Sequence, residues 1–415
     1  MRKWNWLKGL LSVGTALVGS AALAGDVGTI PTIADPDHVF QQTSYDMGVL
    51  GLGGDQCNSC DSGTGLGSWF SGENGDPWKA IDASECGWNI GGWTEFGYSN
   101  KSDGVFETHP RHFDLQQFNL FVEKVADGKD GIGFGGRVDV MYGTDAQNTQ
   151  AFGNQPGKFD YLNGWNHGVY GWAMPQLYAE VAADDLSVKV GHFYTLLGYQ
   201  VVPATGNFFY SIPLTFNFGE AFTHTGALAT YKASDTVTAY AGWTLGWDTG
   251  FNQLGSGSSF LGGAAVKVTD SLTATYITTF GNLGWIGDGY SHSLVLDWII
   301  NEKWEYVFQT DTLRTNGGPA GQLHAGNPYD TVGLNQYLYY TINPKLKLGG
   351  RAEWWKADGQ SYNEITAGIN IMPTANIRLR PEIRHQWAPG ANNVANQFGL
   401  PVDQTMFAFD VIFTF

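Results

Sequence analysis

Charged residues are scarce in this chain of 415 residues, and basic ones are scarcer than acidic ones. Charged side chains make up 15% of the sequence, whereas soluble domains average about 25%. The 22 Lys and Arg residues stand against 39 Asp and Glu, and the formal net charge is −17. So acidic a chain repels phosphates, and we therefore exclude nucleic acid as a partner.

Long apolar runs are also missing. Beyond the N-terminal region, Gly, Thr, Asn or a charge interrupts each apolar run within a few residues, and the mean hydropathy is −0.19. A transmembrane helix needs about 20 apolar residues in succession, so the sequence excludes a helical membrane protein. It does not exclude a membrane β-barrel, because barrel strands carry their apolar surface on every second residue.

The common catalytic motifs are absent. The sequence contains no G-x-S-x-G, H-E-x-x-H or Walker motif. Residues 131–136 fit G-x-G-x-x-G, but the residues that follow alternate like a strand and start no helix. His109 and His112 have no clustered acids beside them, and His292 and Ser293 fall on opposite faces of a strand. We therefore expect no catalytic residue, no cofactor and no metal.

Only three cysteines occur, Cys57, Cys60 and Cys86, and all precede the region of regular pattern. In an exported protein they predict a Cys57–Cys60 or a Cys60–Cys86 disulfide with one thiol left over. A zinc site would need a fourth ligand, and no nearby histidine supplies one.

Residues 1–24 have the composition of a signal peptide, which predicts export. A basic start is followed by an uncharged apolar stretch at 10–23, and Ala22-Leu23-Ala24 offers small residues for cleavage before Gly25. The alternative, a membrane anchor, is disfavoured because the stretch is too short to span a bilayer. Residues 25–86 are rich in Gly, Asp, Ser and Asn, and we expect a loosely ordered periplasmic tail or partial plug.

Glycine and aromatic residues are what the chain has in abundance, with 57 Gly, 16 Trp and an aromatic content of 14%. From Gly87 onward, segments of about ten residues alternate between apolar and polar side chains. In residues 132–142 Ile132, Phe134, Val138, Val140 and Tyr142 share one face with Gly136, and Arg137, Asp139 and Met141 lie on the other. One face suits lipid and the other suits water. The pattern predicts a transmembrane antiparallel up-and-down β-barrel over residues 87–415.

The same alternation predicts about sixteen strands, within a range of about 14–18. They are 87–98, 112–125, 131–142, 173–182, 186–195, 224–232, 236–247, 258–268, 271–281, 290–300, 304–313, 331–342, 346–356, 361–372, 376–387 and 404–415.

The connections between these strands are of two kinds. Very short ones lie at 183–185, 233–235, 269–270, 301–303, 343–345 and 373–375. They alternate with longer ones near 143–172, 196–223, 248–257, 314–330 and 388–403. One rim of tight turns and one of long loops is typical of bacterial outer-membrane barrels, in which the short turns are periplasmic.

The last strand predicts how the barrel is recognised for assembly. Four phenylalanines share one of its faces and the chain stops on the last of them, namely Phe407, Phe409, Phe413 and Phe415. This ending resembles the C-terminal signal that the outer-membrane assembly machinery reads. Together with the signal peptide, it predicts a location in the cell outer membrane.

A central block of motifs carries a family resemblance. It comprises Gly191-His192-Phe193-Tyr194, Gly198-Tyr199, Asn207-Phe208-Phe209-Tyr210 and His224-Thr225-Gly226. The block resembles the OmpL-like β-barrel porin-2 family, which is common in planctomycetes, and in texture the likeness extends over most of residues 87–415. Gln200 stands where we would expect Glu, which leaves no acid at that position. The resemblance implies an outer-membrane barrel with channel function and no catalytic residues.

Loop 196–223 joins the fifth and sixth predicted strands and is unusually aromatic and rich in proline for a loop exposed to water. By analogy with sixteen-stranded porins, we expect it to fold into the lumen as a constriction. Packing outside the barrel, at a subunit interface, is the alternative. The candidate constriction residues are Tyr199, Phe208, Phe209, Tyr210 and Glu220.

Strand 376–387 places its charges on one face. An Arg that faces lipid near the bilayer midplane costs about 2–4 kcal/mol, so this face should point into the lumen. We hypothesise a basic wall opposed by acids, whose transverse field orients solutes; the alternative is that these charges select nothing. The candidate pore-lining residues are Arg351, Arg378, Arg380, Glu382, Arg384, Lys347, Glu353, Glu305 and Asp311, with Asp297 and Glu220 as further opposing acids.

The leading function is therefore passive diffusion of small polar solutes and ions, because about sixteen strands leave an aqueous bore. One alternative is a structural or adhesive barrel that displays loops 143–172 and 196–223. Another is an outer-membrane lipid hydrolase. The expected partners are outer-membrane lipids, the barrel assembly machinery and small polar solutes, and a homotrimer stays open.

Overall fold

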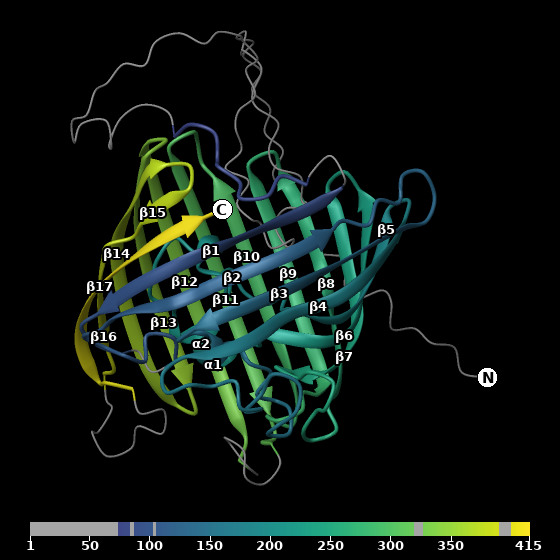
Figure 1. Ribbon diagram of the computed structural model, residues 1–415. Coiled ribbons are helices and arrows are strands. Elements are labelled where there is room, and N and C mark those ends of the chain that lie inside the picture. The colour runs from purple at the N-terminus through teal and green to yellow at the C-terminus, as the bar shows by residue number, and fades with distance from the viewer. Residues whose placement is uncertain (1–73, 84–86, 103–104, 319–326, 390–399) are drawn as a thin grey trace, which may run out of the picture. The chain divides into compact units, whose positions relative to one another are not determined.

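The computed structural model describes residues 74–83, 87–102, 105–318, 327–389 and 400–415. The signal peptide and the three cysteines, Cys57, Cys60 and Cys86, lie outside this part of the chain. The described chain forms a closed antiparallel barrel of sixteen strands, as the sequence predicts (Figure 1). Consecutive strands pair with one another, and β17 pairs with β1 to close the barrel.

The strand bounds follow the alternating segments closely. The strands are β1 (Trp88–Ser99), β2 (Phe113–Lys124), β3 (Gly133–Gly143), β4 (Gly171–Ala183), β5 (Leu186–Tyr194), β6 (Thr223–Ser234), β7 (Val237–Trp247), β8 (Ser258–Thr269), β9 (Leu272–Asn282), β10 (Asp288–Ile299), β11 (Trp304–Thr315), β12 (Tyr329–Asn343), β13 (Leu346–Ala357), β14 (Gln360–Thr374), β15 (Ile377–Leu379), β16 (Glu382–Trp387) and β17 (Asp403–Thr414).

The segments β15 and β16 are one barrel strand with a break. Both pair with β14 on one side and with β17 on the other. The sequence predicts one continuous strand at 376–387, and Pro381 interrupts it. Proline has no N–H to donate to the sheet, so the ladder stops there and resumes at Glu382.

The helices are short and lie in the loops. They are α1 (Ala146–Thr149), α2 (Leu214–Gly219) and the 3-10 helix η4 (Ala204–Gly206). In the described residues, no helix has both the length and the apolar character that crossing a membrane requires.

The two rims differ as the loop lengths predict. One rim carries short turns, such as those at 184–185, 235–236 and 344–345, and we call it the short-turn rim. The other carries loops such as 144–170 and 195–222, and we call it the long-loop rim. An exception on the long-loop rim is the two-residue turn Asp358-Gly359, where both residues have positive φ, 45° and 88°. Asp and Gly are the residues that such tight hairpin turns prefer.

The two faces of the wall have opposite chemistry. Outward side chains are apolar and exposed, with Phe134 at 66% and Phe407 at 56%. The inward residues Arg137, Asp139 and Met141 of β3 are buried. The outer surface is therefore suited to hydrocarbon.

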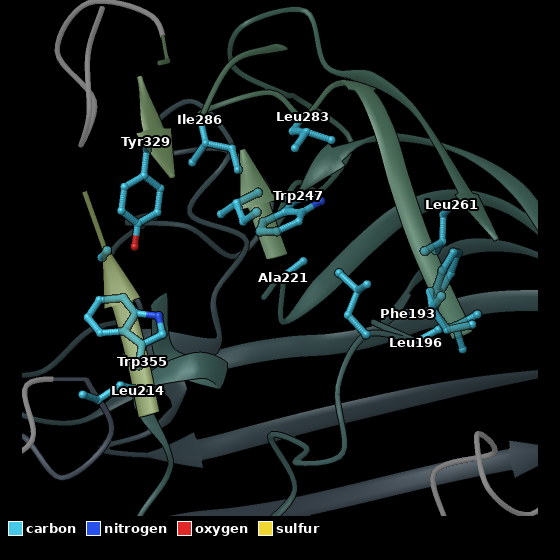
Figure 2. Close-up of a cluster of buried hydrophobic side chains, with 14 of the residues drawn as sticks. Phe193, Leu196, Leu214, Ala221, Trp247, Leu261, Leu283, Ile286, Tyr329 and Trp355 are labelled. Carbon is cyan, nitrogen blue, oxygen red and sulfur yellow. The ribbon is translucent and has the colours of Figure 1, made fainter. Parts of the chain in front are cut away.

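A large buried cluster fills part of the barrel interior (Figure 2). Inward-facing wall residues such as Leu261 and Trp355 join residues of the connection between β5 and β6, such as Leu196 and Leu214. This apolar contact shows that the connection packs against the inside of the wall.

Residues 74–83 bind the short-turn rim. The Nδ2 of Asn74 donates to the carbonyl of Pro344 at 3.0 Å, and Asn376 exchanges two hydrogen bonds with the backbone of Trp78 at 2.6 and 2.8 Å. The Trp78 ring stacks on Phe413 of β17 at 6.1 Å. This segment thus joins the chain before β1 to the last strand.

Candidate functional site

The connection between β5 and β6, residues 195–222, lies inside the barrel, and we call it L3. Its first residues cross to the opposite wall: the Gly198 N–H donates to Oγ of Ser293 in β10 at 3.1 Å. The Tyr199 N–H donates to Oε1 of Gln309 in β11 at 3.4 Å. Ser293 and Gln309 are buried, inward-facing residues. The structure therefore places L3 within the barrel and not on its outside.

Three arginines of the wall hold the middle of L3 by its backbone. Arg380 Nη1 donates to the carbonyls of Ala204, Asn207 and Phe209, at 2.9, 2.7 and 3.0 Å. Arg351 and Arg384 do the same for the carbonyls of Ser211 and Ile212, at 2.6 and 2.8 Å. Charged donors make stronger hydrogen bonds than neutral ones, so L3 is firmly fixed.

Two carboxylates bind L3 from the other direction by accepting its N–H groups. Glu382 accepts from Tyr210 at 2.9 Å and from Ser211 at 3.2 Å. Glu353 accepts from Leu214 and Thr215 at 2.8 and 2.7 Å, which are the first two residues of α2. A carboxylate there satisfies N–H groups that a helix start leaves without partners.

The arginines are balanced by acids on neighbouring strands. Arg380 lies 2.6 Å from Asp410 of β17 and 3.0 Å from Glu95 of β1. Arg351 and Arg384 both contact Glu364 of β14, at 2.5 and 2.8 Å. Buried charges are tolerated when paired and hydrogen-bonded. The wall is therefore a network of alternating charges, whereas the sequence hypothesis of a basic wall placed its acids across the lumen.

The predicted pore-lining residues divide into two groups by exposure. Six are at least nine-tenths buried, namely Arg351, Arg380, Arg384, Glu353, Glu382 and Asp311. Lys347 and Glu305 form an ion pair at 2.7 Å and keep 25% and 24% of their side-chain surface exposed. Arg378 is partly buried and donates to the Thr205 carbonyl at 3.1 Å.

The predicted constriction residues pack on aromatic wall positions. Phe208 lies 4.8 Å from Tyr339, and Tyr199 lies 4.9 Å from Tyr337, as ring centroids. The Arg351 guanidinium lies over the Phe209 ring at 5.1 Å. Tyr210 and Glu220 are also buried. The five residues therefore belong to the interface between L3 and the wall.

Sequence reasoning missed the glycines that make room for L3. A Cβ on Gly97 of β1 would lie 2.5 Å from the Tyr210 hydroxyl. A Cβ on Gly333 of β12 would clash with Thr215. The detectable signal was glycine in the inward phase of a strand, which marks close approach by another chain segment.

The two ends of L3 meet at β11. Nε2 of Gln309 donates both to Glu220 Oε1 at 2.7 Å and to Asp311 Oδ2 at 2.6 Å. Burial and the nearby charge of Asp311 raise the pKa of Glu220 well above its ordinary range. L3 therefore begins and ends on the same wall residue, Gln309.

Beyond Glu220, L3 joins an aromatic cluster at the long-loop rim. Phe222 lies 5.0 Å from Phe216 and 5.4 Å from Phe106, as ring centroids. Asp248, just after β7, accepts from the Phe222 and Thr223 N–H groups at 2.7 and 3.1 Å. Burial raises the pKa of Asp248 to about 7.

The outward groups stand as the strand phases require. Phe407, Phe409 and Phe413 of β17 are exposed on the outside of the barrel, and Phe415 follows as the last residue. His292 is exposed outside and Ser293 is buried inside, so the pair is separated by the wall. Among the described residues, no group of three or more His, Cys, Asp or Glu side chains is suited to a metal ion.

A family model described as "Putative beta-barrel porin-2, OmpL-like" matches residues 87–415. The chain belongs to this porin family. The matched range begins one residue before β1 and ends with the last residue of the chain. As a member, the protein is a β-barrel channel of the outer membrane. No curated protein matches the chain.

Solved porin structures share the barrel architecture. OmpT of Vibrio cholerae, solved in its trimer form, is 11% identical with a TM-score of 0.52 and covers 79% of this chain and 99% of its own. The outer membrane channel DcaP of Acinetobacter baumannii is 11% identical with a TM-score of 0.52, and the match covers 81% of this chain and 100% of DcaP. The anion-selective porin of Comamonas acidovorans is 11% identical with a TM-score of 0.52, covering 79% and 99%. Identities this low show the fold alone.

Proposed function

We propose that the porin passes small polar solutes and ions by diffusion, and that L3 is its fixed constriction. The observation that carries this proposal is the set of hydrogen bonds from three buried arginines to L3 carbonyls. A loop fixed at so many points narrows the bore and sets a size limit. No covalent step is needed.

In this proposal the buried and exposed charges have separate roles. The buried residues, such as Arg351 and Glu353, hold L3 in place. They affect a solute only indirectly, through the position of L3. Lys347, Glu305 and Arg378 keep part of their surface accessible and supply the charge that a passing solute meets. The local field of this partly exposed set then decides ion preference.

The remaining partners follow from the surface and the chain ends. The apolar outer face binds outer-membrane lipids, and the terminal phenylalanines are read by the assembly machinery. Residues 1–24 act as the export signal, and residues 25–86 act as a periplasmic tail or partial plug. A homotrimer is supported by the likeness to a porin solved as a trimer.

Liposome swelling with sugars of graded size tests the constriction. The wild-type protein should admit small sugars and exclude larger ones. A variant that lacks residues 204–215 should admit the larger ones and show a higher single-channel conductance. An unchanged size limit would refute the role of L3, and absence of any conductance in wild-type protein would refute the channel.

A further inference from the structure

The closure of L3 on β11 contains two acids with no cation between them. Glu220 of L3 and Asp311 of β11 are 6% and 4% exposed. They share one donor, because the same Gln309 nitrogen lies 2.7 Å from one carboxylate and 2.6 Å from the other. Two oxygens bound to one nitrogen at these distances are themselves close neighbours.

Each acid also has a second oxygen without a partner. Oε2 of Glu220 and Oδ1 of Asp311 are buried and accept no hydrogen bond among the described residues. Oε2 of Glu220 faces Gly198, where a Cβ would clash with it. A buried carboxylate with an unsatisfied oxygen is costly as an anion, and a proton removes most of that cost.

The surroundings do not neutralise the pair. Within the described part of the chain, the charges that act on Glu220 are those of Asp311 and of Glu353 on β13, and both are negative. Ser293 of β10 hydrogen-bonds to the Asp311 carboxylate, and Tyr337 of β12 lies within electrostatic range of Glu220. Arg351 of β13 is bound to Glu364 and Ser211.

We propose that Glu220 and Asp311 share a proton and together form a latch that closes both ends of L3 on β11. With one proton present, the pair carries a single charge and Gln309 can bridge it. When that proton leaves, two neighbouring anions repel in a buried site. Glu220 then moves off β11 and the constriction loosens. The latch makes the size limit of the channel depend on pH. This consequence rests on the proposed role of L3 as the constriction.

The direction of the pH effect follows from the raised pKa of Glu220. A group whose folded-state pKa is raised stabilises the fold at low pH, and this contribution is lost as pH rises through the folded value. L3 should therefore be closed at low pH and should loosen as pH rises.

The test compares four proteins in planar bilayers across pH 5 to 10, namely wild type, Glu220→Gln, Asp311→Asn and Asp248→Asn. Wild-type conductance should rise with pH, and Glu220→Gln and Asp311→Asn should lose that rise because the pair can no longer become doubly charged. Asp248→Asn is the matched control: it removes a buried acid at the base of the same loop on which no second acid of the described chain acts, and it should keep the rise.

Infrared spectroscopy gives a second reading that needs no conductance. Wild-type protein should show the carbonyl stretch of protonated carboxylic acids, and Glu220→Gln should remove the part of that band that Asp248→Asn leaves in place. A rise of conductance with pH that persists in Glu220→Gln would overturn the latch, as would an infrared band that Glu220→Gln and Asp311→Asn both leave unchanged. Conductance that does not change with pH would refute the latch but not the proposed function. A protein that shows the infrared band but does not conduct would refute the proposed function but not the shared proton.

Discussion

Two places on the inner wall carry the same kinds of charge in the same strand phase, and L3 covers only one of them. Where L3 lies on the wall, Arg380, Asp410 and Glu95 are buried and bonded to one another. Nearer the short-turn rim, Lys347 and Glu305 form a single pair with about a quarter of each side chain exposed. The difference teaches that strand phase directs a charge inward, and that the covering loop decides whether it supports structure or meets solute.

The sharpest way to break this comparison is to remove Arg380. Arg380→Ala deletes three bonds to L3 carbonyls and leaves Asp410 and Glu95 buried without their cation. Removing one partner of a buried ion pair costs about 3–5 kcal/mol. We expect a large fall in the thermal unfolding midpoint in detergent and a higher, noisier conductance.

Arg380→Lys is the control for this substitution. Lysine keeps the charge but lacks the planar fork that reaches Asp410 and three carbonyls together. Arg380→Lys should recover part of the lost thermal stability. Its conductance should remain almost as high and as noisy as that of Arg380→Ala. Equal behaviour of the Ala variant and the wild type would contradict the role of Arg380 as the anchor of L3.

A smaller effect is expected from filling the space that L3 needs. Gly333→Ala places a methyl group against Thr215, and overpacking of this kind costs about 1–3 kcal/mol. L3 should be displaced at α2, which raises the size limit in liposome swelling. Gly350→Ala is the matched control, since its methyl group would meet only the Thr366 carbonyl at 4.0 Å. If both variants behave alike, close packing at Gly333 does not position L3.

Substitution in the partly exposed pair of Lys347 and Glu305 should change ion preference and leave stability almost unchanged. Lys347→Gln removes a partly exposed charge, so stability should change by less than about 1 kcal/mol. The reversal potential in a salt gradient should nevertheless move toward cations, because Glu305 is left without its partner. An unchanged reversal potential would mean that this pair does not face the path of ions.

The smallest effect concerns pH at the base of L3. The pKa of Asp248 is raised to about 7 by burial, so its contribution to stability is present below its ordinary pKa and is lost as pH rises through about 7. The unfolding midpoint of wild-type protein should fall between about pH 4 and pH 7, which is the interval between the ordinary and the raised pKa of this carboxyl group. Asp248→Asn should flatten that part of the curve, and a curve of unchanged shape would contradict the assignment.

The barrel could be predicted from the sequence because its rules are local. A period of two gives the faces of each strand, and turn residues give the ends, so predicted strand 258–268 becomes β8 at Ser258–Thr269. The break at Pro381 was missed because the alternation of side chains continues on both sides of it. The local sequence pattern therefore predicts which way the side chains of a strand face, but it does not predict where the backbone hydrogen bonds are interrupted.

The site could be predicted only in part, because its contacts join distant positions. The inward phase of Arg380 is visible in its own strand, but its bonds to Ala204 and Glu95 cross 176 and 285 positions of the chain. Nothing local marks which acid will balance which arginine. The same applies to Gly333, whose need for space arises from Thr215 on a separate loop.

The seam between β1 and β17 has a consequence for biogenesis. Its two strands come from opposite ends of the matched range, so the cylinder cannot shut until the final strand has been made. A chain cut short by even that strand would expose two unpaired edges, which favour aggregation. The contacts of Trp78 with Asn376 and Phe413 then tie the segment before β1 to the last strand once that strand is in place.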